Sequence, residues 1–72
     1  MTDTFKLEYL LKKAGITKKE YAEKLGISLQ GLYNKLKNST EFKQAEIAIT
    51  CDILRLSSQE RDEIFFGNLV DL

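Results

Sequence analysis

Two amides, a phenol and a lysine lie close together in one short stretch of this 72-residue sequence. On a helical period, Gln30, Tyr33 and Asn34 fall on one outward side, with Leu29 and Lys37 beside them. Gln and Asn side chains can each make two hydrogen bonds to adenine, and Lys can contact guanine or a phosphate. Tyr can pack on a sugar or donate a hydrogen bond to a phosphate. The stretch therefore predicts a surface that contacts double-stranded DNA.

Further candidate contacts flank this surface. Lys18 and Lys19 are expected at the start of the preceding helix, where positive charge opposes the helix dipole. A phosphate contact would account for them, and the alternative is that they are ordinary surface lysines. The predicted DNA-binding residues are Lys18, Lys19, Ser28, Leu29, Gln30, Tyr33, Asn34, Lys35 and Lys37.

Two short helices must position these residues, one over about 18–25 and one over about 29–36. Thr17 followed by Glu20 forms a capping box that starts the first helix. Gly26 ends it, because glycine adopts the left-handed conformation without a Cβ penalty. Ser28 is the expected N-cap of the second helix. Two helices joined by a Gly turn in this spacing are typical of a helix-turn-helix motif, here at about 17–36.

The same stretch resembles the Cro/CI-type (lambda-repressor-like) helix-turn-helix family. Its small, turn, cap and core positions are matched by Ala22, Gly26, Ile27, Ser28 and Leu32. The likeness covers about residues 5–66, and the segment ILRLSSQERDEIFF is similar to small temperate-phage regulators. The resemblance implies an all-α, compact five-helix Cro/CI-type domain. It also implies a phage-type transcriptional regulator of a genetic switch that binds operator DNA.

Two residues depart from the family pattern. Members often carry Arg or Thr where Leu29 and Gly31 stand, and leucine offers only apolar contact. Gly31 lowers helix propensity by about 1 kcal/mol relative to alanine. These departures favour an alternative function, an anti-repressor or modulator that binds a partner repressor and blocks or alters its DNA binding. A structural explanation for both residues stays open.

Three further helices are expected over about 5–14, 43–54 and 58–66. Asn38 is predicted to take the left-handed conformation after the second short helix, and Phe42 to fill the core beneath the following loop. Ser57 with Glu60 forms another capping box, and either Phe65 or Phe66 should close the core. The predicted core faces of the first and fourth helices are Leu7, Leu10, Leu11 and Ala14, and Ile47, Ala48, Cys51 and Leu54.

The fourth helix also carries a second apolar row, formed by Ala45, Ile49 and Ile53. It packs either inside the domain or against another protein. Residues 1–44 carry nine Lys and five acids, a net charge of +4, whereas residues 45–72 carry two Arg and six acids, a net charge of −4. The acidic part suits a basic protein partner, or is an ordinary solvated face. The predicted protein-interface residues are Leu29, Ile49, Ile53, Glu60, Asp62 and Glu63, and the apolar tail (Leu69, Val70, Leu72) is a further candidate.

Composition narrows the function class. The sequence has one Cys and no His, so we expect no internal disulfide, no metal site, no cofactor and no catalytic residues. No apolar run is long enough to span a membrane, and no signal-peptide pattern is present, which favours a cytoplasmic protein. We expect one domain over 1–72, no enzyme activity and no small-molecule substrate. The expected partners are double-stranded DNA and either another phage repressor or a second copy of the chain.

Overall fold

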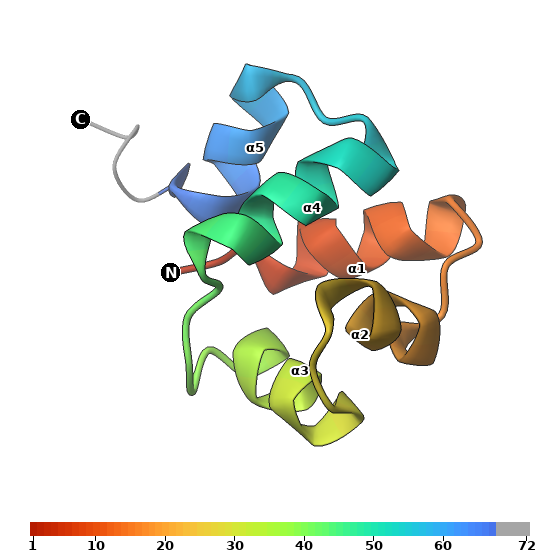
Figure 1. Cartoon of the computed structure of the whole chain (residues 1–72). Helices are drawn as coiled ribbons and strands as arrows, with labels where there is room; N and C mark the ends of the chain where they lie inside the picture. Colours follow the sequence, from red (N-terminus) through yellow and green to blue (C-terminus); the bar gives the residue numbers. More distant parts are fainter. Residues whose placement is uncertain (68–72) are drawn as a thin grey trace.

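The computed structural model describes residues 1–67, and this part of the chain contains five α-helices and no strand (Figure 1). The all-α prediction is therefore confirmed over that range. The helices are α1 (Thr4–Lys13), α2 (Lys18–Leu25), α3 (Leu29–Leu36), α4 (Gln44–Leu54) and α5 (Ser58–Phe65). No helix among the described residues is both long and apolar enough to cross a membrane.

Local capping fixes most of the helix boundaries. The Thr17 hydroxyl accepts a hydrogen bond from the Glu20 backbone N–H (3.1 Å), and the Glu20 carboxylate accepts one from the Thr17 N–H (3.0 Å). Ser57 and Glu60 repeat this box at α5. Gly26 ends α2 in the left-handed region, with φ +74°. The capping predictions are confirmed, because each depends on residues only three or four positions apart.

The end of α5 differs from the sequence prediction. The helix ends at Phe65 rather than at Phe66 before Gly67. Phe66 leaves the helical region with φ −133°, and its side chain is exposed whereas Phe65 is buried. The ring of Phe65 instead meets Phe42 edge to face, with 5.3 Å between ring centroids. Phe42 therefore fills the core beneath the α3–α4 loop, as predicted.

One apolar core is built from buried residues of α1, α2, α3, α5 and the α3–α4 loop, and half-buried apolar residues of α4 pack against it. α2 packs against α3 and α4, and α1 and α4 each pack against α5. On α1 the predicted stripe is confirmed for Leu7, Leu11 and the half-buried Leu10, which packs against the core, and is wrong for Ala14, which is exposed. The buried apolar residues are Leu7, Leu11, Tyr21, Ala22, Leu25, Leu32, Leu36, Phe42, Ile64 and Phe65.

The inner side of α4 is mixed, which corrects part of the sequence prediction: Ile47 and Leu54 pack against the core as expected, but polar residues take the fully buried positions. Its buried residues are Glu46 and Thr50, whereas Ala48 is exposed and Cys51 is half-buried. The predicted face was chosen from apolar spacing alone. Polar residues can take inner positions when they find hydrogen-bond partners there, and both of these do.

Tyr21 supplies one of those partners. Its side chain is fully buried, and its hydroxyl is hydrogen-bonded to the Thr50 hydroxyl. The Thr50 hydroxyl in turn donates to the Glu46 carbonyl oxygen at 2.8 Å, so Tyr21 is the donor to Thr50. Burial raises the pKa of Tyr21 from 10.0 to about 12, because the phenolate form loses its hydration.

This raised pKa predicts a loss of stability at high pH. The unfolded chain releases the Tyr21 proton near pH 10, while the folded chain holds it until about pH 12. The free energy of unfolding therefore carries the full Tyr21 contribution below pH 10 and loses about 2 kcal/mol as the pH rises toward 12. Urea unfolding across this range should show a smaller loss for Tyr21→Phe than for the wild type. Equal losses in the two proteins would contradict the assignment.

The path of the chain places α3 at one end of the molecule. In Figure 1 α3 lies below α1 and α4, while α5 lies at the opposite end. After α3, Asn38 adopts φ +60°, as predicted for a residue that ends a helix in the left-handed region. Its side-chain amide exchanges two hydrogen bonds with the backbone of Thr2, at 3.1 and 3.3 Å. The loop that follows leads to α4.

Candidate binding surface on α3

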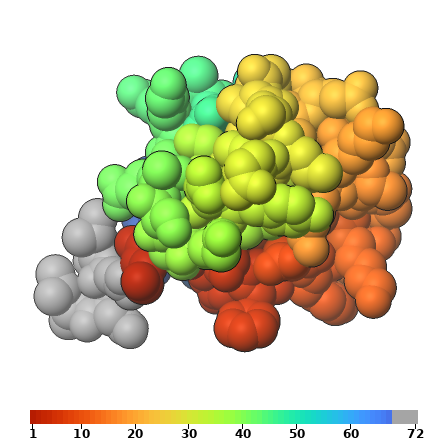
Figure 2. All heavy atoms as spheres, turned by 90° about the horizontal axis from the view of Figure 1, so that it is seen from below, coloured from red at the N-terminus to blue at the C-terminus, as the bar shows by residue number. Residues whose placement is uncertain are grey.

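The outward side of α3 is the candidate functional surface. It occupies the centre of the view from below (Figure 2), with α2 and α1 beside it. Leu29 and Tyr33 are large apolar side chains there, 38% and 40% exposed. Gln30 and Lys37 are also exposed, and Asn34 is half-buried. We call these five residues the α3 face; Leu29, Gln30, Tyr33, Asn34 and Lys37 thus lie together as the sequence predicted.

The two amides of the α3 face are arranged as a pair. The Gln30 side-chain amide donates a hydrogen bond to the Asn34 side-chain oxygen at 3.2 Å. The pair is one helical turn apart, so both groups stand on the same side of α3. This contact orients the amides while leaving them at the surface, where each still has hydrogen-bonding capacity for a ligand.

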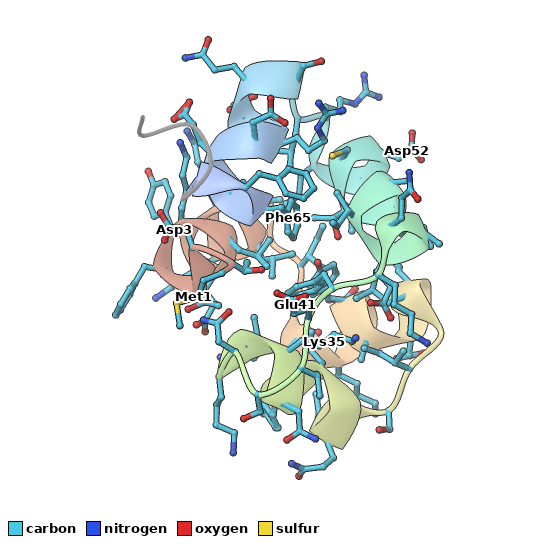
Figure 3. All side chains as sticks on the ribbon, turned by 90° about the vertical axis from the view of Figure 1, so that its left-hand side faces the viewer. Met1, Asp3, Lys35, Glu41, Asp52 and Phe65 are labelled. Atoms are coloured by element: carbon cyan, nitrogen blue, oxygen red, sulfur yellow. The ribbon has the colours of Figure 1, made fainter. Side chains whose placement is uncertain are left out.

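Lys35 is not on this surface, which corrects its place among the predicted DNA contacts. Only 7% of the residue is exposed, and its ammonium nitrogen lies 3.0 Å from an oxygen of the Glu46 carboxylate. The same nitrogen donates to the Glu41 carbonyl oxygen at 3.0 Å and lies 5.8 Å from the centre of the Phe42 ring. Figure 3 shows Lys35 and Glu41 between α3 and α4. The charge of Lys35 is therefore used inside the protein.

This geometry predicts an unequal cost for two neighbouring lysines. Lys35→Met leaves the buried Glu46 carboxylate without its counter-ion, which should cost about 3–5 kcal/mol of unfolding free energy. Lys37 lies two residues further along the chain and is exposed. Lys37→Met should therefore change the free energy of unfolding by less than about 0.5 kcal/mol. Urea unfolding of the two variants measures the difference, and similar costs would show that Lys35 is not an internal ion-pair partner.

Of the two other lysines predicted to contact DNA near the α3 face, one is held in an ion pair and the other is exposed. Lys18 pairs with Glu8 of α1, with 2.9 Å between nitrogen and oxygen. The hydrogen bond and negative charge of Glu8 raise the pKa of Lys18 above its ordinary value. Glu8 and Lys18 line a shallow hollow together with Tyr33 and Lys37, so an acid borders the α3 face. Lys19 is exposed at the start of α2.

Ser28 and Gly31 have structural explanations. The Ser28 hydroxyl accepts a hydrogen bond from the Gly31 backbone N–H at 3.0 Å and caps α3. A Cβ on Gly31 would lie 3.2 Å from that hydroxyl oxygen, closer than most side chains approach. Glycine at this position thus leaves room for the cap. This contact also ties the Ser28 hydroxyl to the helix start, although the residue itself is exposed.

The predicted protein-interface residues do not form one surface. Leu29 lies on α3, whereas Ile49 and Ile53 are half-buried and pack against the core. The acids of α5 lie at the far end of the molecule (Figure 1). Each acid there also has a partner: the Glu60 carboxylate accepts a hydrogen bond from the Ser57 backbone N–H, Asp62 pairs with Arg61, and Glu63 pairs with Lys6. The tail residues Leu69, Val70 and Leu72 lie outside the described residues.

An exposed aromatic pair on α1 escaped the sequence analysis. Phe5 is 88% exposed and Tyr9 is 61% exposed, and their spacing of four places both on the outer side of α1. The apolar stripe of Leu7 and Leu11 predicts only the inner side of this helix. The positions of the two aromatics, off that stripe, would have predicted that both are exposed.

Among residues 1–67, no three His, Cys, Asp or Glu side chains gather as they would around a metal ion. Comparisons of the chain with protein-family models, with curated proteins and with solved structures found no match.

Proposed function

We propose that the chain is a regulator in a phage-type transcription switch that acts on a partner repressor through the α3 face. In this proposal α2, the Gly26 turn and α3 form a helix-turn-helix of the Cro/CI type, within a five-helix domain of that type. The residue pattern from Ala22 to Leu32 and the capped ends of the two helices support this assignment.

The burial of Lys35 is the single observation that favours a protein target over DNA. It leaves Lys37 as the only charged member of the α3 face, and Lys18 beside it is paired with Glu8. Phosphate neutralisation by Lys and Arg supplies most of the affinity of a DNA-binding protein. Lys37 is the one cation within the α3 face, and the exposed Lys19 lies on α2, so the face itself offers few phosphate contacts.

The apolar content of the α3 face fits a protein target better. Tyr side chains are enriched among residues that dominate binding energy at protein interfaces, and Tyr33 stands at the centre of this face with Leu29 nearby. Glu8 borders the face, but its charge is paired with Lys18, so this border is close to neutral. A repressor's DNA-binding face must be basic, so covering it would release the repressor from its operator.

Direct DNA binding is the second candidate function, and the Gln30–Asn34 pair favours it. Both amides are oriented on the outward side of α3, the position from which a recognition helix reads adenine in the major groove. If operator DNA is the target, Gln30→Ala and Asn34→Ala should each weaken binding by about tenfold or more. Unchanged operator affinity in both variants would remove this candidate.

The proposed function predicts which substitutions impair repressor inhibition. Tyr33→Ser and Leu29→Ser should each weaken binding to the repressor of the same switch by at least about tenfold, because they remove apolar contacts at the centre of the interface. Titration calorimetry with that repressor measures the affinity. A gel-shift assay with its operator shows whether the repressor is displaced from DNA.

Tyr9→Ser is the matched control, since Tyr9 is an exposed tyrosine on a different helix. It should leave the affinity within about twofold of the wild type, as expected for a residue outside the interface. Equal effects at Tyr9 and Tyr33, or no binding by the wild-type protein, would overturn the proposed function.

A further inference from the structure

The contacts that hold α3 are of two kinds. Toward α2, α3 is held by apolar packing of buried residues such as Leu32. Toward α4 it is held by the Lys35–Glu46 ion pair, whose two side chains are 9% and 8% exposed. Apolar packing is non-directional, whereas a buried ion pair holds its two charges close together, and the hydrogen bond from Lys35 to the Glu41 carbonyl oxygen adds a direction. The ion pair is therefore the contact that can set the orientation of α3 relative to α4.

The ion pair is part of a connected polar network. One oxygen of the Glu46 carboxylate receives both the Lys35 ammonium at 3.0 Å and the Lys43 backbone N–H at 2.7 Å. The Lys35 ammonium also donates to the Glu41 carbonyl oxygen at 3.0 Å. The network thus joins the last turn of α3, the loop after it and the first turn of α4. No buried side-chain nitrogen or oxygen among the described residues lacks a hydrogen-bond partner.

Stability alone does not account for such a pair. Removing two charges from water costs so much that apolar replacements of similar volume are often equally stable or more stable. What an ion pair adds is a penalty for every arrangement that separates its charges in the interior. Rotation or sliding of α3 on α2 would separate Lys35 from Glu46.

We propose that Lys35 and Glu46 are positioning residues that fix the direction in which α3 presents its outward face. Lys35 lies in the same helical turn as Tyr33 and Asn34, so its anchoring determines where those side chains point. The consequence for target binding rests on the proposed function. The effect on the orientation of α3 does not.

The test removes the ion pair without leaving a charge unpaired. The double variant Lys35→Met, Glu46→Gln keeps the aliphatic stem of the lysine and an oxygen that can accept from the Lys43 N–H. We expect it to fold with a urea midpoint close to that of the wild type. Residual dipolar couplings of the α3 amides should then no longer fit the wild-type orientation, while those of α1 and α4 still fit.

Two further variants separate positioning from a general effect. Lys24→Met, Glu23→Gln makes the same two changes at exposed positions of α2 and should leave all couplings unchanged. Lys35→Arg keeps the positive charge and N–H donors, and should keep the α3 couplings at the wild-type orientation. If the repressor is the target, the ion-pair double variant should also lose about tenfold or more in affinity for it.

Unchanged α3 couplings in the ion-pair double variant would overturn the proposal, whatever the binding result. Failure of that variant to fold would overturn it too, because the pair would then be a requirement of stability. If the wild type binds no repressor but the α3 couplings shift as expected, the proposed function fails and the positioning role stands.

Discussion

The ion pair between Lys35 and Glu46 is the interaction on which the arrangement of α3 depends. It places a charged lysine from α3 and a carboxylate from α4 inside the fold of a chain of only 72 residues. A domain this small buries only about 60% of the surface that its unfolded chain exposes. Each inner position is thus a large share of the core, and α4 gives two of its inner positions to Glu46 and Thr50.

The same interaction changes what the α3 face can bind. Lys35 would be the second cation on α3 if it pointed outward, but its charge is directed to α4. Lys18 is similarly held by Glu8. The first 44 residues carry a net charge of +4, yet two of their lysines are held in ion pairs, Lys35 inside the protein and Lys18 at its surface. Charge counted along the sequence therefore overstates the positive potential beside α3, and the apolar residues Leu29 and Tyr33 gain weight in recognition.

Local signals made the helix boundaries predictable from the sequence. The Thr17–Glu20 box, Gly26 and Asn38 act through neighbouring backbone groups, so their outcome depends little on the rest of the fold. The α3 face followed from the same logic, because a helix that buries Leu32 and Leu36 must expose the opposite side. The Phe42 position was predictable as the large apolar residue in an otherwise polar loop.

The inner side of α4 and the position of Lys35 could not be predicted from the sequence, because they depend on long-range polar contacts. Apolar periodicity placed Ala48 and Cys51 on the inner side of α4. It does not indicate that Lys35 neutralises Glu46 or that Tyr21 forms a hydrogen bond with Thr50. These pairs join residues 11 and 29 positions apart in the sequence. For Lys35 the error carried over to the candidate site, because a lysine beside outward-facing residues was assigned to DNA.

The measurement that tests the choice of target most directly is binding of the wild-type protein alone to its own promoter DNA across a salt series. With a single cation on the α3 face, we expect dissociation constants in the non-specific range, weaker than about 1 µM at physiological salt, and no preference over a scrambled sequence. Nanomolar binding to the promoter, falling steeply with salt and lost on the scrambled sequence, would contradict a protein target and assign the α3 face to DNA.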